Sequence, residues 1–155
     1  MKSKMWLFVL VLLAISACGS GERVINGLTI KPGANLVGAD LEGEDLSNVD
    51  MRRTDLRAAK LSGANLSGAN LSGANLKGAI LVNTNLSGAN PVNASLSGAT
   101  LSSANLSGAN LTGANFTDAI LWNSNLLNAN LTDTNLSGAD LYGVTMPDGA
   151  IYGSK

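Results

Sequence analysis

The residues that could do chemistry in this chain are few, and they do not combine into a catalytic pattern. The 155 residues include no histidine, one cysteine, and 11 aspartates and glutamates. No nucleophile stands beside a base, and no glycine-rich loop precedes a helix to hold a phosphate. A lone cysteine excludes an internal disulfide and a metal site built on thiolates. We therefore expect no enzyme activity, no cofactor, no metal and no small-molecule substrate.

The one cysteine follows a stretch that is typical of an export signal. Residues 1–17, MKSKMWLFVLVLLAISA, contain two lysines, then an apolar run, then small residues. The apolar run is too short to span a bilayer, which needs about 20 residues. The junction Ile15-Ser16-Ala17-Cys18 resembles the bacterial lipobox. This resemblance implies that residues 1–17 are a signal peptide, and that Cys18 becomes the first mature residue and carries acyl chains such as palmitate.

An acylated Cys18 predicts that the protein is held on a membrane of the bacterial cell envelope. Several acyl chains on one residue satisfy the two-signal requirement for stable anchoring. Gly19 stands where many inner-membrane lipoproteins of enteric bacteria carry an aspartate, so the resemblance favours the outer membrane, facing the periplasm. The first expected partner is thus the membrane, contacted through the N-terminal lipid.

The rest of the chain is organised by a repeat of five residues. The repeat is clearest in LSGANLSGANLSGANL over residues 61–76, and it runs from Leu36 to Met146 without an insertion or deletion. Of the 23 positions spaced five apart, 19 are leucine, and the residue two before them is alanine in 16 cases. Leucine and alanine at this spacing share one side of an extended segment. Because five is odd and is not a helical period, the chain must turn a corner in every unit to point all leucines inward.

The repeated ANLSG units resemble those of the pentapeptide-repeat proteins, with leucine as the central residue. The resemblance covers residues 34–151 and implies an all-β fold: a right-handed four-sided parallel β-helix, a solenoid of nearly six coils with four units per coil. Residues that are 20 apart then lie in one column on neighbouring coils. Pro91 stands in a leucine position and cannot donate a backbone hydrogen bond, so it is either tolerated at a corner or marks a kink.

Segments outside the five-residue phase are predicted to close both ends of the repeat. Residues 18–33 are expected to form the lipidated tether and an N-terminal cap, in which an apolar patch surrounds the turn signal Asn26-Gly27. After the last repeat, the ending PDGAIYGSK begins with a turn signal. We expect Ile151 to fill one further core position and residues 152–155 to form a tail.

Charged residues cluster between positions 39 and 60, where acids and bases alternate. With a coil of 20 residues, Asp40 lies in the same column as Lys60. The cluster is either a docking patch near the membrane or a solvated surface with compensating ion pairs, each worth at most about 1 kcal/mol; we favour the second interpretation. Loss of residues 1–17 would change the net charge from −1 to −3, and no basic stripe is present, so no nucleic-acid partner is expected.

One of the four faces carries apolar residues where the repeat otherwise has polar ones. We call them the candidate stripe: Ile80, Val82, Ile120, Trp122 and Tyr142. Trp122 and Tyr142 should share a column toward the end far from the lipid. Exposed apolar patches with aromatic residues are typical of contact surfaces, although scattered surface apolar residues, or a tail folded over them, would also fit the pattern.

These features predict a non-catalytic structural or interaction module at the cell envelope, which presents one side of a rod to a protein partner or to a second copy of itself. The family resemblance also offers an alternative, because some relatives protect DNA gyrase by imitating the shape and charge of DNA. Such a protein works in the cytoplasm and carries acids without interleaved bases. The export signal and the pair Arg52-Arg53 therefore disfavour it.

Overall fold

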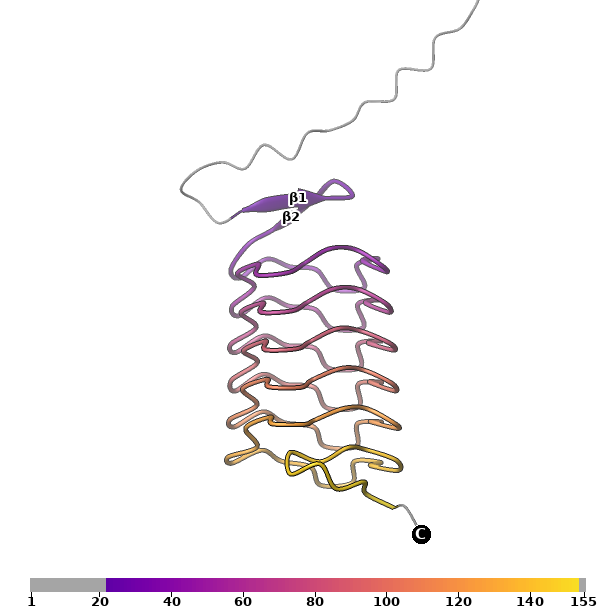
Figure 1. Ribbon diagram of the computed structural model, residues 1–155. Coiled ribbons are helices and arrows are strands. Elements are labelled where there is room, and N and C mark those ends of the chain that lie inside the picture. Colours follow the sequence, from indigo (N-terminus) through magenta and orange to yellow (C-terminus); the bar gives the residue numbers. More distant parts are fainter. Residues whose placement is uncertain (1–21, 154–155) are drawn as a thin grey trace, which may run out of the picture.

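The computed structural model describes residues 22–153. The predicted signal peptide and the lipid attachment at Cys18 lie outside the described residues. Within them, the chain winds as a right-handed four-sided parallel β-helix, as predicted, and its coils stack along one axis (Figure 1). The described part of the chain contains no helix that could cross a bilayer.

Pairing between coils repeats every 20 residues. One column of parallel bridges consists of Asn35, Asp55, Asn75, Ser95, Asn115 and Asn135. At each step the hydrogen bonds run in both directions: Leu36 N donates to Asp55 O at 2.7 Å, and Asp55 N donates to Ala34 O at 2.9 Å. The ladder therefore satisfies the backbone although each straight segment between two corners is very short.

Each corner is a β-turn that begins at a core leucine. Ala39 N donates to Leu36 O at 3.0 Å, and Gly38, the third residue of this turn, has a φ of 66°. A positive φ at the third residue explains why glycine and asparagine are frequent there. The polar residue before the leucine supports the same corner, because Asn65 Oδ1 accepts a hydrogen bond from Ser67 N at 3.2 Å.

The core consists of the leucine column and the alanine column of each face. Leu61 and Ala64 are fully buried, and the larger Phe116 is 1% exposed in a leucine position. Thr84 occupies an alanine position, where its Oγ1 donates to Leu61 O at 2.7 Å. Ser124 occupies another, but its buried Oγ has no hydrogen-bond partner among the described residues.

A short hairpin lies over the first coil (Figure 1). Strands β1 (Arg23–Ile25) and β2 (Leu28–Ile30) pair in antiparallel register through the two-residue turn Asn26-Gly27. Both turn residues have positive φ, at 51° and 76°, as a type I′ turn requires. Ile30 is fully buried, and other apolar residues of the hairpin pack against the core. The hairpin therefore covers an apolar end that would otherwise meet water.

The C-terminal end differs from the expectation for Ile151. The chain reverses after Met146, Thr145 pairs with Ile151 in antiparallel orientation, and Ile151 is 54% exposed. Ile151 therefore does not fill a core position. The reason is the turn that follows Pro147: Asp148 Oδ1 accepts from Ala150 N at 3.0 Å, which bends the chain back along the last coil instead of into a new one.

Pro91 is buried in its leucine position, and the repeat continues through it. Its column nevertheless lacks one link within the described residues, since Asn70 bridges Asn90 and Asn110 bridges Asn130 but Asn90 and Asn110 are not bridged. The ring nitrogen carries no hydrogen to donate to Asn110 O. Asn90 Oδ1 is also buried, without a hydrogen-bond partner in the part of the chain that the structure describes. Pro91 is thus a local defect in the ladder.

Candidate functional site

The candidate stripe lies on one face of the rod, but it is interrupted. Tyr142 is 66% exposed, Trp122 47% and Ile80 42%, whereas Val82 and Ile120 are half-buried. Bridges connect Ile80 to Thr100 and Thr100 to Ile120, so a polar residue separates the two isoleucines. Ser102 separates Val82 from Trp122 in the same way, one coil from each. The five residues therefore form two spots, and the larger one is aromatic.

Trp122 and Tyr142 line one open hollow of about 530 Å³, together with Asn123 and Asp140. We call these four residues the aromatic hollow. Trp122 and Tyr142 are one coil apart, as their spacing predicts, and Asn123 N donates to Tyr142 O at 3.0 Å. Gly143 N donates to Tyr152 O at 2.9 Å, so the backbone beside Tyr142 is held from both sides. The hollow is therefore built on rigid backbone.

The two polar side chains of the hollow were not among the predicted site residues. Asp140 Oδ1 accepts from Tyr142 N at 3.2 Å, which fixes the carboxylate beside the ring and leaves its second oxygen without a hydrogen bond among the described residues. The Asn123 amide likewise has no partner in the described part of the chain. It lies against Gly143, where any Cβ would collide with Asn123 Oδ1. The 20-residue spacing could have identified Asp140 in the sequence, because Asp140 shares a column with Ile120 of the candidate stripe.

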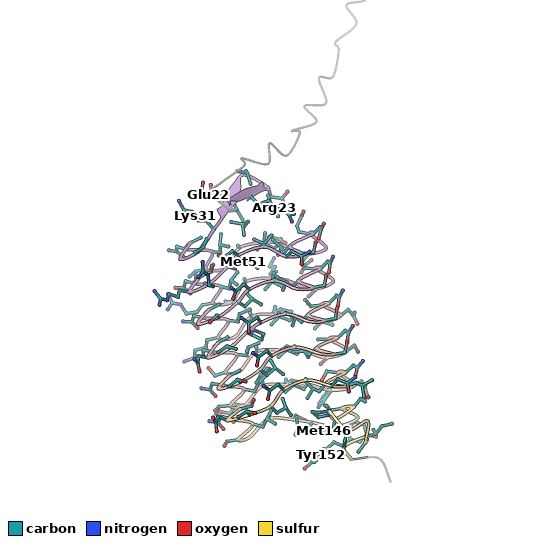
Figure 2. The ribbon with its side chains drawn as sticks, turned by 60° about the vertical axis from the view of Figure 1, so that its left-hand side comes forward. Glu22, Arg23, Lys31, Met51, Met146 and Tyr152 are labelled. Atoms are coloured by element: carbon teal, nitrogen blue, oxygen red, sulfur yellow. The ribbon has the colours of Figure 1, made fainter. Side chains whose placement is uncertain are left out.

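The C-terminal segment runs past this hollow without covering it. Figure 2 shows Met146 and Tyr152 at the end of the rod opposite Glu22 and Arg23. Tyr152 N donates to Val144 O at 2.8 Å, so the segment is paired to the edge of the last coil. Trp122 and Tyr142 remain exposed beside it.

The charged end of the rod contains ion pairs on its surface. Lys60 Nζ lies 3.6 Å from Asp40 Oδ2, in the column that the sequence predicts. Arg52 and Arg57 each pair with the aspartate two residues earlier, at 2.7 and 2.8 Å. Hydrogen bonds from these guanidinium groups lower the pKa of Asp50 and of Asp55, and hydrogen bonds from Ser47 lower the pKa of Asp45. These charges are mostly compensated in place.

A second open hollow, of about 520 Å³, lies at this charged end and is lined by Pro32, Gly33, Arg52, Arg53 and Ser72. Arg52 already forms an ion pair with Asp50, whereas Arg53 has no ion pair within residues 22–153. The described residues contain no cluster of histidine, cysteine or carboxylate groups that could hold a metal ion. The aromatic hollow is therefore the better candidate for a binding site.

Comparison with known proteins places this architecture in a family. The family model for pentapeptide repeats matches residues 34–73, 69–108, 79–118 and 109–146. A pentapeptide repeat protein from the cyanobacterium Cyanothece 51142 is 38% identical, with a TM-score of 0.52, over 70% of this chain and 84% of that chain. No curated protein matches the chain.

Two further solved structures resemble the chain less closely in shape. A pentapeptide repeat protein from Nostoc PCC 7120 is 39% identical over 48% of this chain and 62% of that chain, with a TM-score of 0.48. QnrB1, a plasmid-mediated fluoroquinolone resistance protein, is 25% identical over 76% of this chain and 67% of that chain, with a TM-score of 0.33. The family model spans most of the repeat, and the coils have the predicted 20-residue period; the chain belongs to the pentapeptide-repeat proteins.

Proposed function

We propose that this protein is a non-catalytic interaction module, anchored by lipid at the bacterial cell envelope, whose rod presents the aromatic hollow to a protein partner. The observation that carries the proposal is the exposed pair Trp122 and Tyr142, on a rod whose corners are otherwise mainly polar. Exposed tryptophan and tyrosine on rigid backbone are typical centres of protein contacts. The anchoring part rests on the sequence Ile15-Ser16-Ala17-Cys18.

The position of the hollow suits a protein anchored at its N-terminus. The hairpin β1–β2 marks one end of the rod, and the aromatic hollow belongs to the coils nearest the other end (Figure 1). A lipid on Cys18 would hold the hairpin end at the membrane, so the hollow would face away from it. Because backbone hydrogen bonds join every coil to the next, the rod would act as a spacer of fixed length.

The alternative, a gyrase-binding protein that imitates DNA, finds little support in the charges. DNA carries uninterrupted negative charge along its length. Here Asp50 and Asp55 are neutralised by adjacent arginines, and most of the surface beyond them is uncharged.

Detergent phase separation of cells that express the full chain tests the anchoring. We expect the wild type in the detergent-rich phase, with a mass that shows acylation at Cys18. The variant Cys18→Ala should lose the mass of the acyl chains and move to the aqueous phase, because attachment of the lipid needs the thiol. Ser20→Ala, which leaves the junction intact, is the matched control and should behave as the wild type.

If Cys18→Ala remained in the membrane fraction to the same extent, the apolar run before it would be an uncleaved anchor. If the wild type itself were soluble in the cytoplasm, the envelope proposal would be wrong. The export signal would then no longer argue against the gyrase-binding alternative.

A further inference from the structure

The two halves of the rod differ in charge. Residues 22–77 contain seven bases and seven acids, whereas residues 78–153 contain four acids and neither lysine nor arginine. The aromatic hollow belongs entirely to the second half, and one of its four residues is the carboxylate Asp140. The local potential at the hollow is therefore negative, which favours a cation and repels phosphates and other anions.

The groups in the hollow match the needs of an organic cation. The faces of tryptophan and tyrosine rings attract ammonium and guanidinium groups, and tryptophan does so most strongly. The second oxygen of Asp140 has no hydrogen-bond donor among the described residues, so it can accept from an N–H group. The backbone segments that carry the two rings lie on neighbouring coils, about 4.8 Å apart along the rod. One planar guanidinium group could therefore contact a ring and a carboxylate at once.

We propose that the aromatic hollow binds an arginine or lysine side chain of a partner protein, held by cation–π contact with Trp122 and Tyr142 and by an ion pair with Asp140. This inference rests on the proposed function, since it names the chemistry by which the interaction module recognises its partner. The described bases of the same chain lie at positions 23–77, more than two 20-residue coils before Trp122.

Trp122 fluorescence measures the occupancy directly. Trp6→Phe is introduced throughout, so that Trp122 is the only indole whether or not residues 1–17 are removed. The isolated protein at low concentration should show red-shifted emission that acrylamide quenches readily, because the ring is half exposed. The probe is a five-residue peptide that carries two arginines between glycines; it should shift the emission to shorter wavelength, and added salt should weaken the effect.

Single-residue variants measure what each side chain of the aromatic hollow contributes to binding of the peptide. Calorimetry provides a second measurement of the affinity. Asp140→Asn keeps the oxygen that accepts from Tyr142 N and removes only the charge, and it should weaken peptide binding about tenfold. Trp122→Ser and Tyr142→Ser restore the residue type found at this position in many other units, so the rod should fold while the affinity falls by a similar factor. Asp133→Asn removes one charge from another face and should change the affinity less than about twofold.

Three results would overturn the inference. Equal losses in Asp140→Asn and Asp133→Asn would show that the peptide senses only the net charge. Binding of a matched glutamate peptide or of chitotetraose in place of the arginine peptide would assign the hollow to another ligand class. Emission that is already blue-shifted would mean that the hollow is filled without a partner. In that case dependence on protein concentration would identify a second copy, and a red shift in Lys155→Gln would identify the chain's own lysine.

These outcomes are independent of the anchoring test. If Cys18→Ala leaves the membrane as expected but the arginine peptide does not bind, the inference alone fails. If the peptide binds but the wild type is not lipidated, the hollow keeps its chemistry and the proposed location fails.

Discussion

At the scale of single residues, the polar positions of the repeat have structural roles that their exposure conceals. Asn85 Nδ2 donates to Asn65 Oδ1 at 3.1 Å, and Asn65 Oδ1 also accepts from Ser67 N in its own corner. Such a side chain closes its corner and connects it to the next coil. The repeat therefore favours asparagine for its two kinds of hydrogen bond, which aspartate or serine can replace only in part.

The corner position with positive φ allows a matched pair of substitutions. Ala58 has a φ of 54°, and Gly78, one coil along in the same column, has a φ of 65° with open space around it. We expect Ala58→Gly to raise the free energy of unfolding by about 1 kcal/mol, because alanine is strained in this region. Gly78→Ala should lower it by a similar amount. Thermal unfolding checks both, and equal signs for the two variants would contradict this account.

At the scale of elements, the rod depends on what closes or interrupts its ladder. The hairpin β1–β2 and the reversed segment after Met146 occupy the two terminal edges, where unpaired backbone would otherwise invite pairing with other chains. Pro91 is the internal interruption. It removes one donor, yet Asn93 N still donates to Thr112 O at 2.9 Å, so the defect remains confined to one corner.

Replacement of Pro91 by leucine should stabilise the rod. Pro91→Leu supplies an N–H group for Asn110 O, in the manner of Leu71 N, which donates to Asn90 O at 3.1 Å, and it adds a buried side chain. One hydrogen bond is worth about 1 kcal/mol, which corresponds to a rise of about 2–4 °C in melting temperature for a chain of this size. Leu71→Pro is the matched control and should lower the melting temperature. A lower value for Pro91→Leu would mean that the fixed φ of proline contributes more than the missing bond.

The sequence predicted the elements well wherever the period is strict. Leucines five apart can all be buried if the chain turns a corner in every unit. The resemblance to the pentapeptide-repeat proteins added the four-sided coil of 20 residues, which places Asp40 and Lys60 in one column. The five-residue period does not predict the structure of the segments that lie outside the repeat. The reversal at Pro147 therefore left Ile151 exposed against expectation. The hollow was predicted only in part, because Asn123 conforms to the repeat and stands out only once its free amide is seen beside Tyr142.

At the scale of the whole molecule, charge and ion pairing are unequally distributed. The described ion pairs involve residues between Glu22 and Lys60, and the basic side chain of each pair is about half exposed. The hairpin end therefore responds to proton concentration through paired carboxylates, whereas the end with the aromatic hollow has acids without bases.

Stability should fall in acid through the paired aspartates. The pKa of Asp50 and that of Asp55 are lowered in the folded protein from the ordinary value of 3.8, chiefly by hydrogen bonds from Arg52 and Arg57. Their contribution is present above that value and is lost as the pH falls through the lower folded value. We expect a melting temperature that is constant from pH 7 to about 5 and decreases below about 4.

A substitution isolates this effect. Asp55→Asn keeps an acceptor for Arg57 N and removes the ion pair, so the decrease in acid should be smaller than in the wild type. Asp133→Asn, which removes a carboxylate without an ion pair among the described residues, should leave the decrease unchanged. A decrease of the same size in Asp55→Asn would assign the acid sensitivity to other groups.

Because the 20-residue period is unbroken, each five-residue unit that is added or removed would rotate the rest of the coil by one side of the square. Each five-residue unit occupies one side of the square, so a single unit gained or lost between residues 122 and 142 would keep every leucine inside while moving Tyr142 to the adjacent side, away from Trp122. A gain of four units would return Tyr142 to its side of the rod, but it would then lie two coils from Trp122 instead of one. The packing of the core does not depend on the number of units. The geometry of any site built from residues of two coils does. The aromatic hollow therefore constrains the length of the repeat in a way that stability does not.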